Sequence, residues 1–227
     1  MLKPEDFFDL SEFEHRAIFD DVEYVWEVVS KIKGYIKQVI QPKISGKVMD
    51  GAFLIGDDIQ IGEGTIVEPG AFITGPTIIG KNTEVRHGAY VRGSVIVGDE
   101  CVVGHATEMK NAIMLNGAKA GHFAYIGDSI LGNDVNLGAG TKLANLKFEQ
   151  LNSSINIMIG DKMYETGLRK LGGILGDRTE TGCNSVMSPA TLLGPNSIVY
   201  PNSTVKGYYP ANSIIKSRQN LELIENK

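Results

Sequence analysis

The stretch IGEGTIVEPGAFITGPTIIGKNTEVRHGAYVRGSVIVGDECVV, residues 61–103, repeats with a period of six residues. Counting by sixes from Ile55 to Gly121 gives twelve positions, of which eleven are aliphatic and Gly121 is the exception. Glycines at Gly62, Gly80 and Gly98 recur every eighteen residues. One inward aliphatic side chain per short repeat, with a glycine that permits a turn, is typical of a β-helix in which each repeat supplies one strand. We therefore predict triangular coils of eighteen residues.

The repeat changes at two places downstream. Five residues rather than six separate Ile126 from Leu131, and the period is lost between Lys147 and Thr166. Within this interruption, SINIMIGDKMYETG (154–167) predicts a strand, a Gly-Asp turn and a second strand, forming a small hairpin that projects from the prism. The repeat then returns at Leu175, Thr181, Met187, Leu193, Val199 and Val205.

The residues before the repeats predict a helical segment of roughly forty residues. Ser11 followed by Glu14 resembles a capping box, and the pair Gln41-Pro42 ends the segment. Apolar residues recur at helical spacing at Val25, Val28, Val29, Ile32, Ile36 and Ile40. This stripe predicts docking on the prism, on a partner subunit or on a partner protein. We divide the chain into a helical segment (1–43), a β-helix (44–215, with an inserted loop at 147–170) and a tail (216–227).

The composition narrows the classes of function. The chain has 227 residues, of which 42% are hydrophobic and 22% charged, as in soluble globular proteins. No apolar stretch is long enough to cross a bilayer, and the acidic start MLKPEDFFDLSEFEHR is unlike a signal peptide, so we expect a cytoplasmic protein that does not bind membranes. Two cysteines are too few for a disulfide framework. The formal net charge of −5 gives no electrostatic footprint for nucleic acid.

Coils of eighteen residues predict which side chains stack. Arg92 and Lys110 become neighbours on one edge, where two cations repel unless they splay apart or share an anion. Two interpretations remain, a phosphate site or two solvated surface cations. His87 and His105 also stack, and without a third metal ligand at a recognisable spacing we interpret them as solvated or hydrogen-bonded rather than as a metal site.

The same count predicts a column of Glu68, Arg86, Gly104 and His122. Gly104 would then leave open space directly beneath the imidazole of His122. A histidine beside a gap is well placed to meet a ligand and to act as a base near neutral pH. A structural role for His122 is the alternative.

The segment VGHATEMKNAIMLNGAKAGHFAYIGDSILGNDVNLGAGTKLAN (103–145) resembles the acetyltransferase domain of bifunctional glucosamine-1-phosphate acetyltransferase and N-acetylglucosamine-1-phosphate uridylyltransferase. The blocks KAGHxxYxGD and VNxGAG carry the likeness, which extends more weakly from about Arg92 to Arg218. The segment TGLRKLGGILGD (166–177) is more similar to archaeal-type sugar-1-phosphate nucleotidylyltransferases. We expect the helical segment to stand where those proteins carry a nucleotidyltransferase domain.

The resemblance implies an all-β, left-handed β-helix that assembles as a homotrimer and uses acetyl-coenzyme A as co-substrate. It implies His122 as catalytic base, Glu108 as its support, Ala139 as a backbone N–H donor to the thioester oxygen and Asn145 as a contact to the acetyl group. It assigns the sugar and its phosphate to Arg92, Lys110, Tyr125, Asn136 and Lys170. It assigns the binding of coenzyme A to Ala139, Cys183, Pro201 and Arg218, and it implies no metal.

The function implied is N-acetylation of an amino sugar phosphate, most simply glucosamine 1-phosphate, in the synthesis of nucleotide sugars for the cell envelope. Two departures keep alternatives open. Asn145-Leu146-Lys147-Phe148 stands where the family has Asn-Tyr-Asp-Gly, and Pro201 stands where a small residue is usual. The alternatives are a non-catalytic scaffold, a ligand-sensing partner of a separate nucleotidyltransferase, or acetylation of another, nucleotide-linked amino sugar.

Overall fold

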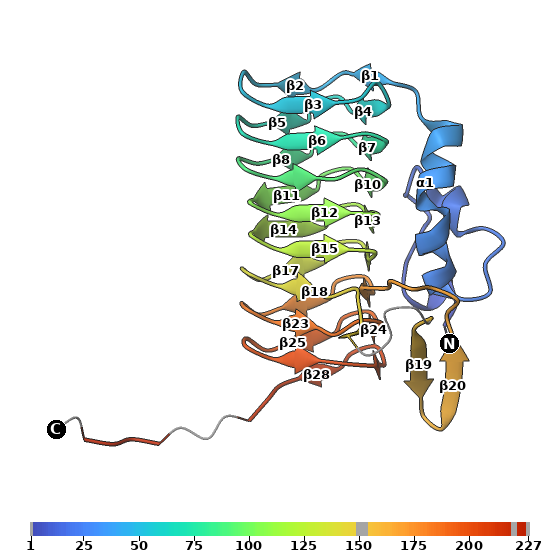
Figure 1. The fold of residues 1–227 in the computed structure, drawn as a ribbon, viewed down its shortest axis with the longest axis vertical. Coiled ribbons are helices and arrows are strands. Elements are labelled where there is room, and N and C mark those ends of the chain that lie inside the picture. The colour runs from blue at the N-terminus through green and yellow to red at the C-terminus, as the bar shows by residue number, and fades with distance from the viewer. Residues whose placement is uncertain (1, 149–153, 219–221, 226–227) are drawn as a thin grey trace.

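The repeats form a three-sided prism of parallel strands, a left-handed β-helix, in the computed structural model of the chain (Figure 1). The structure describes residues 2–148, 154–218 and 222–225. The predicted fold class is confirmed. Three parallel sheets make the faces, which we call sheets A, B and C in the order in which the chain visits them.

The strands are short, because each repeat crosses one face and then turns a corner. Sheet A contains β1 (Lys43–Ile44), β4 (Ile59–Ile61), β7 (Thr77–Ile79), β10 (Val95–Val97), β13 (Ala112–Met114), β16 (Ile130–Leu131), β21 (Gly173–Leu175), β24 (Thr191–Leu193) and β27 (Tyr208–Tyr209). Sheet B contains β2 (Lys47–Val48), β5 (Ile66–Val67), β8 (Glu84–Val85), β11 (Val102–His105), β14 (Lys119–His122), β17 (Asn136–Leu137), β22 (Glu180–Thr181), β25 (Ile198–Val199) and β28 (Ile214–Ile215). Sheet C contains β3 (Phe53–Ile55), β6 (Phe72–Thr74), β9 (Tyr90–Val91), β12 (Glu108–Lys110), β15 (Tyr125–Gly127), β18 (Lys142–Leu143), β23 (Val186–Met187) and β26 (Thr204–Val205).

The aliphatic side chains of the repeat fill the prism, as the period predicts, except at three positions. Leu54 rather than Ile55 pairs with Ile73, and Ile55 is 46% exposed. Further along, Met114 and not Leu115 pairs with Val97. Ala120, not Gly121, then pairs with Val103, so the apparent break at Gly121 is a shift in count rather than a missing core residue.

This shift arises from coils of seventeen residues. Met109 and Met114 both point into the core, and so do Ile126 and Leu131, so the step between core residues is five instead of six at each of these corners between sheets C and A. Asn111 and Asp128 sit at the two corners with positive φ of 47° and 49°. Asparagine and aspartate tolerate this left-handed conformation better than other non-glycine residues, so one such residue can close the corner. The sequence showed the second short corner but not the first.

The segment before the prism is less helical than its spacing predicts. It contains three short 3-10 turns, η1 (Pro4–Asp6), η2 (Arg16–Phe19) and η3 (Val25–Glu27), and one α-helix, α1 (Val28–Val39). The expected capping box is wrong, because Ser11 lies in a turn where its N–H donates to the carboxylate of Asp9. Helix α1 ends just before Gln41-Pro42, as predicted.

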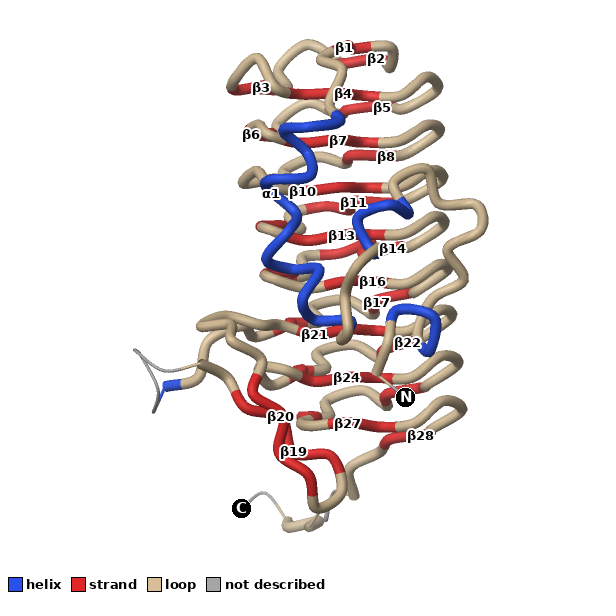
Figure 2. Tube along the Cα trace, turned by 90° about the vertical axis from the view of Figure 1, so that its right-hand side faces the viewer, coloured by secondary structure: helices blue, strands red, loops and turns tan. Residues whose placement is uncertain are grey.

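This segment docks on sheet A of its own prism (Figure 2). Val28, Val29, Ile32 and Ile36 of α1 are buried there. They belong to one cluster with the outward side chains of the sheet, Ile78, Ile96, Ile113, Ile130, Ile174 and Leu192. Full burial of each such side chain contributes roughly 1.5–3 kcal/mol, so the segment is an integral wall of the fold. No helix in the described part of the chain has the length and apolarity needed to span a bilayer.

The predicted hairpin is confirmed in the interruption of the repeat. Strands β19 (Asn156–Ile159) and β20 (Lys162–Glu165) pair antiparallel around Gly160-Asp161. The hairpin does not stand free, because the ring of Tyr164 lies edge-on to Tyr24 and Trp26, at centroid distances of 5.7 and 6.1 Å. The inserted loop thus packs against the N-terminal segment.

Candidate active site

Seven residues stack in one column at the corner between sheets B and C. We call this the corner column; its members are Pro69, His87, His105, His122, Ala139, Cys183 and Pro201. Backbone hydrogen bonds set the order from His87 to Pro201, because the N–H that follows each later member donates to the carbonyl of the member on the preceding coil. Pro69 joins the column through its carbonyl, which lies within hydrogen-bond distance of the His87 ring. Phe123 N donates to His105 O at 2.6 Å, and Gly140 N donates to His122 O at 3.1 Å. Asn184 and Asn202 continue the series onto Ala139 at 2.8 Å and Cys183 at 2.9 Å.

His122 therefore stands over His105 and not over Gly104. The two histidines are direct partners between β11 and β14, seventeen residues apart. A side chain added to Gly104 would collide with the backbone of Gly121, so the predicted gap beneath His122 is wrong. The short corner at Asn111 explains the error, because it moves every later residue by one place in the stack.

Two of the histidines have their tautomers fixed by the column. His87 Nδ1 lies 2.7 Å from Pro69 O, and His105 Nδ1 lies 3.0 Å from His87 O. A carbonyl can only accept, so Nδ1 carries the hydrogen in both rings. The two imidazoles are stacked, with centroids 5.8 Å apart and planes 6° apart. Among the described residues, no group of three or more His, Cys, Asp or Glu is arranged to hold a metal ion.

The His122 side chain is exposed at the end of β14 and makes no hydrogen bond to a described residue. The backbone N–H of Ala139, on the next coil, also donates no hydrogen bond to a described residue. A free imidazole and a free N–H thus occur on adjacent coils of the corner column.

A second group of candidate residues lies on sheet C. Arg92 Nη1 lies 2.7 Å from Glu108 Oε1, and this hydrogen bond raises the pKa of Arg92. Glu108 pairs in register with Tyr125 on the neighbouring strand. Burial raises the pKa of Tyr125, and the nearby carboxylates of Glu108 and Asp128 add to the effect. Arg92 and Lys110 stack as predicted, since Arg92 follows β9 and its N–H donates to Met109 O at 2.8 Å.

Asn145 joins this group from the corner between sheets C and A. Its side-chain amide donates to Asp128 Oδ2 at 2.5 Å, while Asn111 donates to Asp128 Oδ1 at 2.9 Å. Leu171 N donates to Asn145 O at 3.0 Å, which brings Lys170 next to Asn145 across the insertion. The strand and corner contacts thus assemble Arg92, Glu108, Lys110, Tyr125, Asn145 and Lys170 along one edge of sheet C.

Two predicted site residues lie apart from that edge. Asn136 is exposed on sheet B, between Lys119 and Glu180. Arg218 is exposed beyond the last strand, and the adjacent Ser217 lies 3.4 Å from Ser203, measured between their hydroxyl oxygens. The predicted residues therefore divide between the sheet C edge, the corner column and these two outlying positions.

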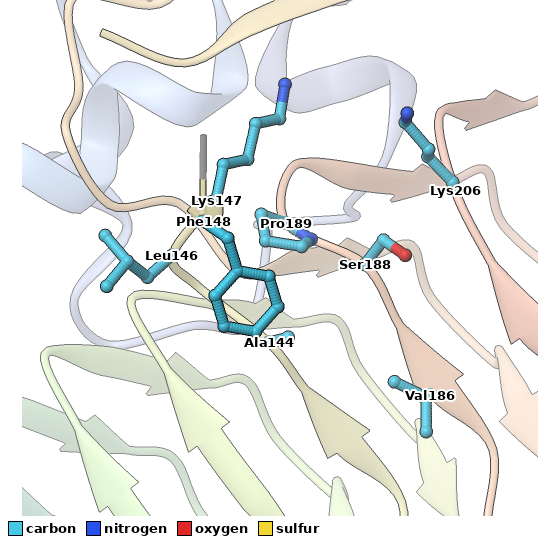
Figure 3. Close-up of a pocket in the computed structure, with 8 residues that line it drawn as sticks. All are labelled: Ala144, Leu146, Lys147, Phe148, Val186, Ser188, Pro189 and Lys206. Carbon is cyan, nitrogen blue, oxygen red and sulfur yellow. The ribbon is translucent and has the colours of Figure 1, made fainter. Parts of the chain in front are cut away.

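A pocket of about 620 Å³, which the sequence did not predict, opens where the insertion leaves sheet C (Figure 3). Ala144, Val186 and Ser188 lie along its floor, and Leu146 and Pro189 add apolar walls. The ammonium groups of Lys147 and Lys206 project on the same side of it. Lys147 and Lys206 are 59 residues apart in the sequence, so no short motif relates them.

One family model and several curated relatives match most of the chain. Residues 73–215 match the family model described as the GMPPB C-terminal domain. The chain is 37% identical over 218 residues to the bifunctional protein GlmU of Methanococcus maripaludis strain C7, covering 96% of this chain and 52% of the relative. It is 31% identical over 192 residues to the bifunctional sugar-1-phosphate nucleotidylyltransferase/acetyltransferase of Sulfurisphaera tokodaii, covering 85% and 47%. The chain thus spans about half the length of these curated relatives.

Among solved structures, the UDP-N-acetylglucosamine acyltransferase of Arabidopsis aligns with a TM-score of 0.47 at 15% identity, covering 79% of this chain and 71% of that one. The Francisella novicida enzyme of the same name aligns with a TM-score of 0.40 at 18% identity, covering 72% and 59%.

Proposed function

The chain belongs to the GMPPB C-terminal domain family, and from this premise we propose that it is an acetyl-coenzyme A-dependent N-acetyltransferase. Its acceptor is an amino sugar phosphate, for which glucosamine 1-phosphate is the first candidate. The relatives that match most of this chain include a protein named as a bifunctional sugar-1-phosphate nucleotidylyltransferase/acetyltransferase, which supports the class of reaction.

The observation that carries the proposal is the corner column. His122, Ala139, Cys183 and Pro201 occupy one line on four successive coils, held by the backbone hydrogen bonds described above. Coils in such a stack are about 4.8 Å apart, so the line runs roughly 14 Å down one corner. An extended thioester arm laid along it would meet Pro201 and Cys183 first and bring its acetyl group to Ala139 and His122. Arg218 would contact coenzyme A beyond the last coil.

His122 is the proposed general base. The amine nitrogen of the sugar attacks the acetyl carbonyl carbon while the imidazole removes its proton, and the carbon–sulfur bond then breaks to release the thiol. A positioned base of this kind contributes about 10² to 10⁴ in rate. The unoccupied N–H of Ala139 can donate to the oxyanion that forms during attack. No acyl-enzyme is required, so Cys183 has no nucleophilic role.

The sheet C edge is the proposed acceptor site. Arg92 and Lys110 bind the phosphate, since stacked cations are best stabilised by a shared anion. Tyr125 and Lys170 hold the sugar, and Asn145 contacts the acetyl group. Asn136 lies apart from this edge, on sheet B, so its proposed contact to the sugar requires a neighbouring copy of the chain. Glu108 supports the base only if its carboxylate leaves Arg92, to which it is bonded in the structure.

A homotrimer is the proposed assembly. The helical segment covers sheet A, while exposed apolar side chains remain on the other two faces, Ile66 and Ile198 on sheet B and Phe53 and Phe72 on sheet C. Contacts through the free faces would bring the corner column of one copy against a neighbour. Light scattering should then give three times the 24.6 kDa chain mass. A cytoplasmic location and a separate nucleotidyltransferase partner belong to the same proposal.

A second candidate function is a non-catalytic prism that binds a ligand. The Arg92–Glu108 ion pair favours it, because neither group is bonded to His122. Leu146 and Lys147 favour it too, since they stand where the bifunctional acetyltransferases that the sequence resembles have a Tyr-Asp pair. This prism would bind sugar phosphates without transferring an acetyl group.

One assay separates the two candidates. The protein is incubated with acetyl-coenzyme A and a panel of amino sugar phosphates, and free thiol release is followed for the wild type and His122→Ala. We expect release with at least one acceptor and a loss of about 10² or more in the variant. Lys110→Ala should raise the acceptor KM more than it lowers kcat. Absence of release with every acceptor would reject the enzyme, and an undiminished rate in His122→Ala would reject the proposed base.

A further inference from the structure

The pocket beneath Lys147 and Lys206 has no place in the reaction outlined above. Ala144, Ser188 and Lys206 lie on three successive coils, since Ala144 N donates to Met187 O at 2.9 Å and Ser188 N donates to Val205 O at 2.8 Å. The floor is therefore rigid β-helix, and the start of the insertion forms the opposite wall.

The two lysines lack acidic partners. Neither forms an ion pair within the described part of the chain. The Nζ of Lys147 donates to Asn156 O at 3.0 Å, which fixes it against the hairpin. Burial lowers the pKa of Lys147, and the charge of Lys206 lowers it further, so the two cations are close enough to repel. A bound anion would relieve this repulsion, and lysine is a common point-charge ligand for phosphate.

The rest of the pocket is suited to a larger ligand than phosphate. Its volume of about 620 Å³ lies within the range typical of small-molecule sites. Leu146, Pro189 and Val186 offer apolar surface, and Ser188 supplies a hydroxyl that can donate or accept. Cations at the rim above a mainly apolar cavity match a molecule with a flat, weakly polar body and a phosphate group.

We propose that this pocket binds a nucleoside phosphate, with the phosphate between Lys147 and Lys206 and the base against the apolar wall. Two sources share this chemistry, and naming them rests on the proposed function: the nucleotide of a nucleotide-linked amino sugar and the phosphorylated adenosine of coenzyme A. The first is favoured by position, because Ala144 directly precedes Asn145 in the acceptor site. The acceptor would then be nucleotide-linked, in place of glucosamine 1-phosphate.

Calorimetric titration of the full chain tests the site without turnover. The probes are UDP, adenosine 3′,5′-bisphosphate, uridine and inorganic phosphate. We expect at least one of the two nucleotides to bind more tightly than uridine and inorganic phosphate. Lys206→Met should weaken that binding about tenfold, as loss of one charged hydrogen bond implies. Lys206 is exposed, so the variant should fold normally, and Lys206→Arg should retain most of the affinity. Lys81→Met, an exposed lysine at another corner, is the matched control.

The nucleotide whose binding is weakened by Lys206→Met identifies the source of the nucleoside phosphate. Weakened UDP binding with no effect on adenosine 3′,5′-bisphosphate supports an acceptor nucleotide, and the reverse supports coenzyme A. Failure of both nucleotides to bind overturns the proposal, as does equal binding to wild type and Lys206→Met. Inorganic phosphate that binds as tightly as the nucleotides overturns the nucleoside part. If nucleotides bind but no thiol is released with any acceptor, the pocket stands and the acetyltransferase does not.

Discussion

His105 and His122 are backbone partners on adjacent coils, seventeen residues apart, and this pairing sets the geometry of the corner column. It exists because Asn111 closes the preceding corner with one residue fewer than the repeat predicts. The catalytic candidate is thus positioned by a turn eleven residues upstream. Glycines at positions 104 and 121 report directly on this register.

Gly104→Ala should destabilise the protein, whereas Gly121→Ala should not. A Cβ at Gly104 would collide with the Gly121 backbone, while one at Gly121 has open space within 4 Å. Neither glycine has positive φ, so crowding is the only difference tested. Overpacking against rigid backbone costs about 1–3 kcal/mol in the free energy of unfolding. Denaturant titration measures both variants, and equal midpoints would contradict the seventeen-residue register.

The architecture could be predicted from the sequence because the repeat is a local signal, one inward aliphatic per six residues. The order in which side chains stack could not be predicted, because each short corner shifts all later residues by one position and these shifts add up. The short corner puts Met114 in the core, but the next residue, Leu115, is also aliphatic and is the position that the six-residue count reaches. The count therefore appears to continue unbroken. The eighteen-residue count is right for Arg92 and Lys110, which lie before this corner, and wrong for His122, which lies after it and stacks on His105.

The helical segment shows a different limit. Its apolar spacing is present, but only α1 is an α-helix. Before it, the chain forms short 3-10 turns and irregular segments that pack the rings of Phe8, Phe13 and Phe19 against one another. The sequence does not predict the pocket, for a third reason. Lys147 and Lys206 come together only through the insertion and the last coils, which no short spacing records.

Ile32→Ala should lower the free energy of unfolding by about 2–5 kcal/mol, the usual cost of truncating a buried isoleucine. Its side chain is fully buried between α1 and sheet A. Lys33→Ala, at the exposed next position, is the control and should change stability by less than about 0.5 kcal/mol. Denaturant titration compares the two. A similar small change in both would mean that α1 contributes little to the fold.

Glu108→Gln should separate binding from turnover. The Arg92–Glu108 pair is partly exposed, so its loss should change stability by no more than about 1 kcal/mol. Under the proposed function, the carboxylate competes with the acceptor phosphate for Arg92, so its neutralisation should lower the acceptor KM. If Glu108 also supports His122, kcat should fall in the same variant. Steady-state kinetics with thiol detection measures both constants, and a raised KM would contradict the competition.

The two cysteines should differ sharply in reactivity. Burial raises the pKa of Cys101 to about 12, and its thiol donates to Leu115 O at 3.0 Å, so almost no thiolate forms near pH 8. Cys183 is exposed in the corner column. A chromogenic disulfide reagent should therefore modify one thiol per native chain, and two after denaturation. Cys183→Ser should abolish the native reaction, and fast modification of two native thiols would contradict the buried position of Cys101.

The same reagent tests whether coenzyme A follows the corner column. Cys183 lies two coils from His122 along the proposed thioester path, so a bound cofactor should cover its sulfur. S-alkylated coenzyme A, which carries neither a free thiol nor a disulfide, should slow the modification of Cys183 severalfold. Cys183→Ser should retain most acetyl transfer, because the sulfur is a contact and not a nucleophile. Undiminished labelling at saturating cofactor would place the path elsewhere, and a large fall in kcat with an unchanged coenzyme A KM in Cys183→Ser would contradict the contact role and favour an acyl-cysteine step.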